Sequence, residues 1–323
     1  MRGQILELIR CNHCGSTPLD LEITEEDHLE ILEGKLWCTK CGLTYPIIEG
    51  VINTIQNETI PELLTAQESE ETLNKELNDE WLLSLPYPKH HPTDTTFEIK
   101  GGDKAVNFFD MLDRMELKGN ETILELGAGN CWATNIFAQR GCRCIATDVR
   151  MRRYYGLRSG RIFINHQGHF FERVLSDLEN PPFADNVFDV VFAQSSLQYA
   201  TNLNGCLSEI SRVLKPGGRL VSAYSGVYGL FKQRNNKSPG YFLPKLMKAL
   251  RKTRLKGQLI FPIYIEKHFR EGVPQDKPFY HIGNMFSRIW NRIPWLHMPF
   301  RKIGPYPLSL FFGVPVNLIA RKE

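Results

Sequence analysis

The fold is decided by Thr122-Ile-Leu-Glu-Leu-Gly-Ala-Gly-Asn-Cys-Trp132, an apolar run that breaks at two glycines and continues at helical spacing. Its apolar half suits a buried parallel strand, and Gly127 and Gly129 allow the chain to turn tightly. A helix that starts behind such a turn offers free N–H groups to a ligand at the carboxyl ends of the strands. The stretch therefore predicts a nucleotide-binding turn. The dinucleotide fingerprint has a third glycine where Trp132 stands, so the pattern Glu125-x-Gly127-x-Gly129 indicates a different nucleotide.

Two acids stand at the ends of the next two apolar runs. The first is Asp148, nineteen residues after Gly129, where a carboxylate can accept both hydroxyls of a ribose. The second is Asp177, where the amino group of an adenine could be held. Further strands and helices are expected over three segments: 182–192, 203–214 and 219–223. The chain is therefore predicted to contain an α/β domain that binds its nucleotide at one edge of a parallel sheet.

In this order, the segments resemble the class I S-adenosylmethionine-dependent methyltransferases over about residues 104–225. The resemblance implies an α/β fold with a Rossmann-like seven-stranded sheet, and S-adenosylmethionine as the cofactor. It implies that the cofactor is bound on its methionine side by Glu125, Gly127 and Gly129, on its ribose by Asp148, on its adenine by Asp177 and Leu178, and near the methyl group by Gln194. Cys131 departs from the family pattern, because many members have a third glycine there.

Two Cys-x-x-Cys pairs near the start of the chain are separated by 23 residues. Two such turns can present four thiolates tetrahedrally to one zinc ion, so the predicted metal ligands are Cys11, Cys14, Cys38 and Cys41. Four protein ligands leave no open position, and we expect this zinc to hold the fold without taking part in chemistry. Residues 36–52 also resemble the small zinc-ribbon proteins that activate tRNA and release-factor methyltransferases, in which the ribbon is a separate partner.

These features divide the chain into five expected segments. They are a zinc ribbon at 1–57, a linker and substrate-side cap at 58–103, the cofactor-binding core at 104–225, a basic and aromatic helical insertion at 226–305, and the final strand of the core at 306–323.

Composition sets broad limits on the class of protein. At 323 residues, with 42% hydrophobic and 23% charged residues, the chain can bury one large core and one or two small ones. No apolar stretch before Cys11 suits a signal peptide, and no run reaches the roughly 18 apolar residues of a membrane-spanning helix. We therefore expect a cytoplasmic protein, or one bound to a membrane surface from the cytoplasm.

Basic residues gather in two places, and each admits more than one interpretation. Six arginines lie between residues 150 and 173, where they suit either an anionic acceptor or a solvated basic helix. Residues 241–256 form a basic amphipathic pattern that is typical of a peripheral membrane contact. The same insertion could instead be a lid packed on its own domain, or an RNA-binding surface.

Three functions remain open from the sequence. The first is an enzyme that methylates oxygen or nitrogen on a small or lipid-linked acceptor, expected to be anionic. The second is an RNA methyltransferase that docks RNA through the ribbon and the basic insertion, and the third is a regulatory protein that binds the cofactor without turnover. A hydroxyl acceptor needs a general base, for which the candidates are Tyr199, His166 and His169.

Overall fold

A computed structural model of the chain describes residues 1–56, 77–86, 97–228, 230, 240–260 and 315–323. Its main element is one sheet with the strand order β1-β2-β3-β4-β7-β6-β5-β8-β9-β13-β12. The last seven strands form the expected methyltransferase sheet, with β13 antiparallel to its neighbours. Their bounds are β5 Thr122–Leu126, β6 Arg143–Asp148, β7 Glu172–Leu175, β8 Phe188–Gln194, β9 Leu214–Ser225, β12 Leu255–Ile260 and β13 Val316–Lys322.

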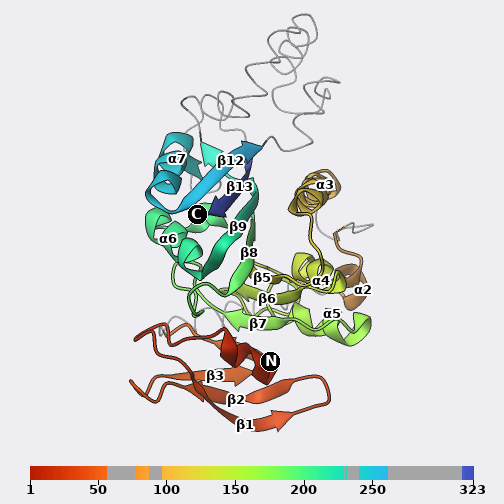
Figure 1. Ribbon diagram of the computed structural model, residues 1–323. Coiled ribbons are helices and arrows are strands. Elements are labelled where there is room, and N and C mark those ends of the chain that lie inside the picture. The colour runs from red at the N-terminus through yellow and green to blue at the C-terminus, as the bar shows by residue number, and fades with distance from the viewer. Residues whose placement is uncertain (57–76, 87–96, 229, 231–239, 261–314) are drawn as a thin grey trace, which may run out of the picture.

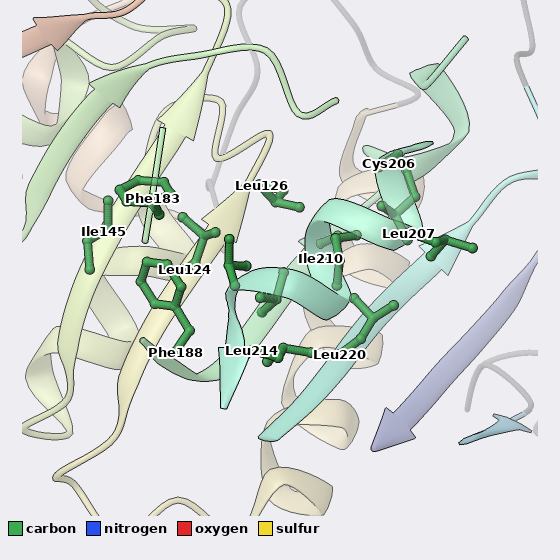
Figure 2. Close-up of a cluster of buried hydrophobic side chains, with 14 of the residues drawn as sticks. Leu124, Leu126, Ile145, Phe183, Phe188, Cys206, Leu207, Ile210, Leu214 and Leu220 are labelled. Atoms are coloured by element: carbon green, nitrogen blue, oxygen red, sulfur yellow. The ribbon is translucent and has the colours of Figure 1, made fainter. Parts of the chain in front are cut away.

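Helices cover both faces of this sheet (Figure 1). The apolar side chains of the central strand β5 alternate, so Leu124 and Leu126 belong to one buried cluster and Ile123 to the other. Figure 2 shows the first cluster, to which Leu207 and Ile210 belong together with Leu124. The helices are α2 Asp79–Leu83, α3 Phe97–Met115, α4 Trp132–Gln139 and α5 Ser159–Gln167 on the side of the second cluster, and α6 Leu203–Val213 and α7 Leu243–Lys252 on the side of the first.

The N-terminal ribbon is an antiparallel arrangement of four strands preceded by a short helix. It comprises η1 Gly3–Glu7, β1 Asp20–Glu26, β2 Ile31–Trp37, β3 Thr44–Ile48 and β4 Val51–Asn53. β4 also pairs in parallel with β7, with Ile52 opposite Val174. The ribbon therefore extends the methyltransferase sheet from seven strands to eleven, and Figure 1 shows it lying along the β7 side of the core.

A buried group of charges joins the ribbon to the core. The Arg173 guanidinium lies 2.6 and 2.7 Å from the two carboxylate oxygens of Glu30, and both side chains are fully buried. Arg161 adds a 2.7 Å ion pair to the same carboxylate, and Arg158 pairs with Glu49 at 2.7 Å. Burial disfavours the charged form of Glu30, but the surrounding cations outweigh it and lower the pKa of the carboxyl. Backbone pairing and charge together fix the ribbon to β7.

The part of the predicted insertion that the structure describes belongs to the core. β12 pairs antiparallel with β13, and α7 packs against α6 with Leu243, Leu246 and Leu250 buried. In the structure the helical pattern after residue 226 is α7, which packs on the core, and the strand after it, β12, joins the sheet. The aromatic part of the insertion lies outside the described residues.

Two further strands, β10 Val227–Tyr228 and β11 Tyr241–Phe242, form a small parallel sheet beyond the end of β9. No helix among the described residues is long and apolar enough to cross a membrane.

Candidate cofactor and metal sites

The glycine turn after β5 has the conformation that the sequence predicts. Gly127 has φ 71°, and a Cβ atom built there would lie 2.4 Å from the Cβ of Ser196, so the position requires glycine for two reasons. Ser196 donates its hydroxyl to the Leu126 carbonyl at 2.6 Å. Cys131, at the position where the family resemblance leads one to expect a third glycine, adopts φ 65° and begins α4 as its N-cap residue. The left-handed turn is therefore kept without that glycine.

Asp148 lies against this turn, at the carboxyl end of β6. One of its carboxylate oxygens accepts the Gly129 N–H at 2.8 Å, and the other accepts the Arg150 N–H at 3.0 Å. Burial raises the pKa of Asp148, and the two backbone N–H groups oppose that rise. The fold thus brings together the acid expected to bind ribose and the loop expected to bind the methionine side.

Glu125 lies inside the domain, beneath the turn. Its carboxylate accepts the Thr134 hydroxyl of α4, and burial raises the pKa of Glu125 to about 8. The described geometry makes it a support for the turn that joins β5 to α4.

Replacing Glu125 by glutamine is expected to remove a pH dependence of stability. In the unfolded chain this carboxyl ionises near 4.5 and in the folded chain near 8, so between these values the folded state holds the extra proton. Stability therefore falls as the pH rises through this window, by at most about 1.4 kcal/mol per pH unit. Urea unfolding at both ends of the window should show a smaller difference for Glu125→Gln than for the wild type. Glu7→Gln, which changes an exposed carboxylate, is the control. An equal change of the unfolding free energy with pH in all three proteins would contradict the raised pKa of Glu125.

The loop expected to hold adenine follows β7. Asp177 is exposed and accepts the Glu179 N–H at 2.9 Å, while Leu178 packs partly against the first cluster. The Glu179 carboxylate then accepts the Thr201 hydroxyl at 2.9 Å and the Asn202 N–H at 3.2 Å. Glu179 therefore ties the adenine-side loop to the loop after β8. Sequence reasoning did not identify it, because its partners lie more than twenty residues away.

The residues that the sequence analysis assigned to the methyl-transfer position divide into two groups. Gln194 ends β8, and Tyr199 follows in η2 Leu197–Tyr199 with 61% of its side chain exposed, on the same edge of the sheet as the glycine turn. His166 and His169 are exposed between the end of α5 and the start of β7. Because α5 returns the chain to the amino end of β7, the fold places both histidines at the opposite edge. They are not brought to the cofactor-binding residues.

Four sulfur atoms in the ribbon meet the requirements of a tetrahedral metal site. The Sγ atoms of Cys11, Cys14, Cys38 and Cys41 all lie within 4.8 Å of one another. Cys11 and Cys41 are 3.6 Å apart and Cys14 and Cys38 are 3.5 Å apart, close to the roughly 3.8 Å between thiolates on one zinc ion. The Tyr45 hydroxyl donates to Cys11 at 3.1 Å. Burial opposes ionisation of Cys11, but this bond and nearby N–H groups lower its pKa to about 6, which favours a thiolate.

Four of the six arginines between residues 150 and 173 pair with acids of the protein itself. Arg158, Arg161 and Arg173 all pair with acids of the ribbon, as described above. Arg153 lies 3.3 Å from Asp79, and so contacts α2. These contacts do not involve Arg150 and Arg152, so an anionic acceptor stays a prediction.

Comparison with known proteins places two domains on the chain. A methyltransferase domain profile matches residues 124–222, and a Trm112p-like protein profile matches residues 4–50. A demethylmenaquinone methyltransferase of Corynebacterium glutamicum (strain R) is 34% identical over 110 residues, which cover 34% of this chain and 44% of that protein. A malonyl-[acyl-carrier protein] O-methyltransferase of Buchnera aphidicola is 30% identical over 111 residues, covering 34% and 42%. The chain thus spans less than half the length of these curated relatives.

A solved structure supports the fold assignment. Geranyl diphosphate C-methyltransferase from Streptomyces coelicolor, in complex with Mg²⁺, geranyl-S-thiolodiphosphate and S-adenosyl-L-homocysteine, aligns with a TM-score of 0.50 and 16% identity. The alignment covers 79% of this chain and 97% of that one. The chain therefore carries a methyltransferase domain with the class I fold, joined to a Trm112p-like zinc-ribbon domain that precedes it.

Proposed function

We propose that this chain is an S-adenosylmethionine-dependent methyltransferase that acts on a small or lipid-linked acceptor. The observation that carries the proposal is the 2.8 Å contact between the Asp148 carboxylate and the Gly129 N–H, which sets a ribose-binding acid beside a glycine turn. The curated relatives agree with this class, since one acts on demethylmenaquinone and another on a malonyl group carried by a protein.

In this proposal the cofactor supplies an activated methyl group, and the protein supplies alignment. Asp148 would bind the ribose hydroxyls, the turn at Gly127 and Gly129 would admit the methionine end, and Asp177 with Leu178 would hold the adenine. Gln194 would lie beside the methyl-transfer position. Tyr199 is the one predicted catalytic candidate whose backbone lies at this edge of the sheet.

Asp148→Ala is expected to reduce the affinity for S-adenosylhomocysteine by about 100-fold or more. Two hydrogen bonds from hydroxyls to a carboxylate are each worth roughly 1.5–3 kcal/mol, and both are lost. Isothermal titration calorimetry measures the effect, with Asp20→Ala, an exposed acid of the ribbon, as the control. Unchanged affinity in Asp148→Ala would refute the ribose assignment, and with it the observation on which the function rests.

We propose further that the four-cysteine cluster holds zinc in a structural role. Four thiol ligands at the observed separations fill the coordination sphere, which leaves no position for a substrate or a reactive water.

The exposed cations of α7 support a contact with an anionic surface. Within the described residues, Lys245, Lys248 and Arg251 form no ion pair, while the apolar side of the same helix is buried on α6. Such a face suits electrostatic contact with anionic lipid head groups and not insertion into a bilayer. The same cationic face of α7 could also contact the phosphates of RNA, so RNA is a second candidate acceptor.

A further inference from the structure

Three segments meet at the carboxyl edge of the sheet, beside the glycine turn. We name them the acceptor edge: residues 194–200, 223–228 and 240–243. Hydrogen bonds join the three: Ser195 N–H to the Ala223 carbonyl at 2.9 Å, Gly226 N–H to Gln198 Oε1 at 3.4 Å, and the Tyr241 hydroxyl to the Leu197 carbonyl at 2.8 Å. The close packing of Ser196 on Gly127 places this unit next to the predicted methionine end of the cofactor.

The acceptor edge contains no charged residue. Its three segments read Gln-Ser-Ser-Leu-Gln-Tyr-Ala, Ala-Tyr-Ser-Gly-Val-Tyr and Gly-Tyr-Phe-Leu, without Asp, Glu, Lys, Arg or His. Aromatic side chains are frequent instead: Tyr199 is 61% exposed, and Tyr228 and Phe242 stack with ring centroids 5.9 Å apart. Rings of this kind contribute apolar contact area and favour flat apolar partners.

Two residues of the acceptor edge adopt a backbone conformation that side chains disfavour. Ser195 has φ 52° and Tyr224 has φ 54°, at the ends of the neighbouring strands β8 and β9. Each conformation costs about 1–3 kcal/mol, and such strain gathers at ligand sites where the surroundings enforce it. Here the Tyr224 N–H donates to Asn317 Oδ1 at 2.8 Å, and the same oxygen accepts the amide of Asn107 at 3.0 Å. Both asparagines are fully buried, so the strained edge is held by a fixed support.

We propose that the acceptor edge binds an uncharged acceptor that presents an aromatic ring or a similar flat apolar surface. This inference rests on the proposed function and names the chemical class of its substrate. It differs from the anionic acceptor expected from the sequence, because three of the arginines behind that expectation pair with the ribbon.

Methyl transfer from the cofactor to a phenol-type hydroxyl would suit such an acceptor. A new bond forms between the acceptor oxygen and the methyl carbon, the bond from that carbon to the cofactor sulfur breaks, and the sulfur keeps the electron pair. The acceptor proton passes to water. A phenol loses this proton far more readily than an alkyl alcohol, so the reaction can proceed beside an edge that holds neither carboxylate nor imidazole.

The test compares naphthol with naphtholsulfonate, which has the same ring and carries a fixed negative charge. Each is titrated by calorimetry into the protein saturated with S-adenosylhomocysteine. We expect naphthol to bind at least about 10-fold more tightly than the sulfonate, because an uncharged edge offers no partner for the desolvated charge. Tyr199→Ala should weaken naphthol binding about 3- to 10-fold, the usual value of one aromatic contact. Tyr199→Phe should restore it, and the affinity for S-adenosylhomocysteine should be equal in all three proteins.

Three results would overturn the inference: equal or tighter binding of the sulfonate, no detectable binding of naphthol, or an unchanged naphthol affinity in Tyr199→Ala. Because Tyr199 is largely exposed, its replacement is not expected to unfold the protein. Failure of the proposed function looks different, since the wild-type protein would then not bind S-adenosylhomocysteine at all.

Discussion

A Cys38→Ser variant is expected to lose its metal and the fold of residues 1–56. The ribbon is small, and structural zinc in domains of this size contributes an apparent 10–16 kcal/mol, so three sulfur ligands and a hydroxyl cannot sustain it. Metal analysis should give less than one zinc per chain, and hydrogen exchange should show loss of protection in β1 to β4. A full equivalent of zinc in Cys38→Ser would contradict the four-thiolate site.

Thr39→Ala is the matched control, because it changes an exposed residue of the same turn and leaves all four cysteines in place. The Cys38→Ser variant also tests whether the ribbon supports the predicted cofactor site. The ribbon contacts the chain that leaves β7: Thr54 donates its hydroxyl to the Leu175 carbonyl at 2.9 Å, and the Arg10 N–H donates to the Pro182 carbonyl at 2.9 Å. We therefore expect Cys38→Ser, and not Thr39→Ala, to weaken S-adenosylhomocysteine binding.

Arg173→Met is expected to destabilise the protein by about 3–5 kcal/mol. The substitution removes the fully buried cation from the Glu30 carboxylate, which keeps Arg161 and the Met1 ammonium as partners, and loss of one partner from a buried charge pair has an effect of up to this size. Urea unfolding measures the change. Arg143→Met is the control, since its 3.4 Å pair with Glu7 is exposed and such pairs contribute about 1 kcal/mol or less. A loss below about 1 kcal/mol in Arg173→Met would refute the assigned role.

The pH dependence gives a second readout of the same pair. The pKa of Glu30 is lowered in the folded chain, so its stabilising contribution is complete above the unfolded value of 4.5 and is lost as the pH falls through the folded value. The difference between Arg173→Met and the wild type should therefore shrink in acid.

Much of the core could be predicted because its signals are local. The turn after Leu126 requires glycine, each parallel strand is a short apolar run, and Asp148 stands directly at the end of such a run. Parallel strands place their carboxyl ends at one edge, so the sequence predicted the proximity of Asp148 and Gly129 that the structure contains.

The docking of the ribbon could not be predicted in this way. Arg173 and Glu30 are 143 residues apart, and nothing near either residue indicates the other. β4 has only three residues, too few for a periodic pattern. The arginines around residue 160 consequently resembled a ligand site, although they serve an internal contact.

Two other points could not be decided from the sequence pattern, for different reasons. The amphipathic pattern of α7 was read correctly as a helix, but periodicity does not show whether an apolar face meets lipid or another helix. His166 and His169 were considered for their chemistry without regard to chain direction. A helix that follows a parallel strand must return to the start of the next one, and this rule alone places both residues away from the reacting edge.

The parallel pairing of β4 with β7 also determines whether another protein can bind the outer edge of β7. A free ribbon protein of the same kind would need an exposed strand to extend, and the outer side of β7 is already occupied. Covalent attachment keeps the resident copy at a high effective concentration, commonly in the millimolar range. The ratio of ribbon to core is therefore fixed at one to one in each chain.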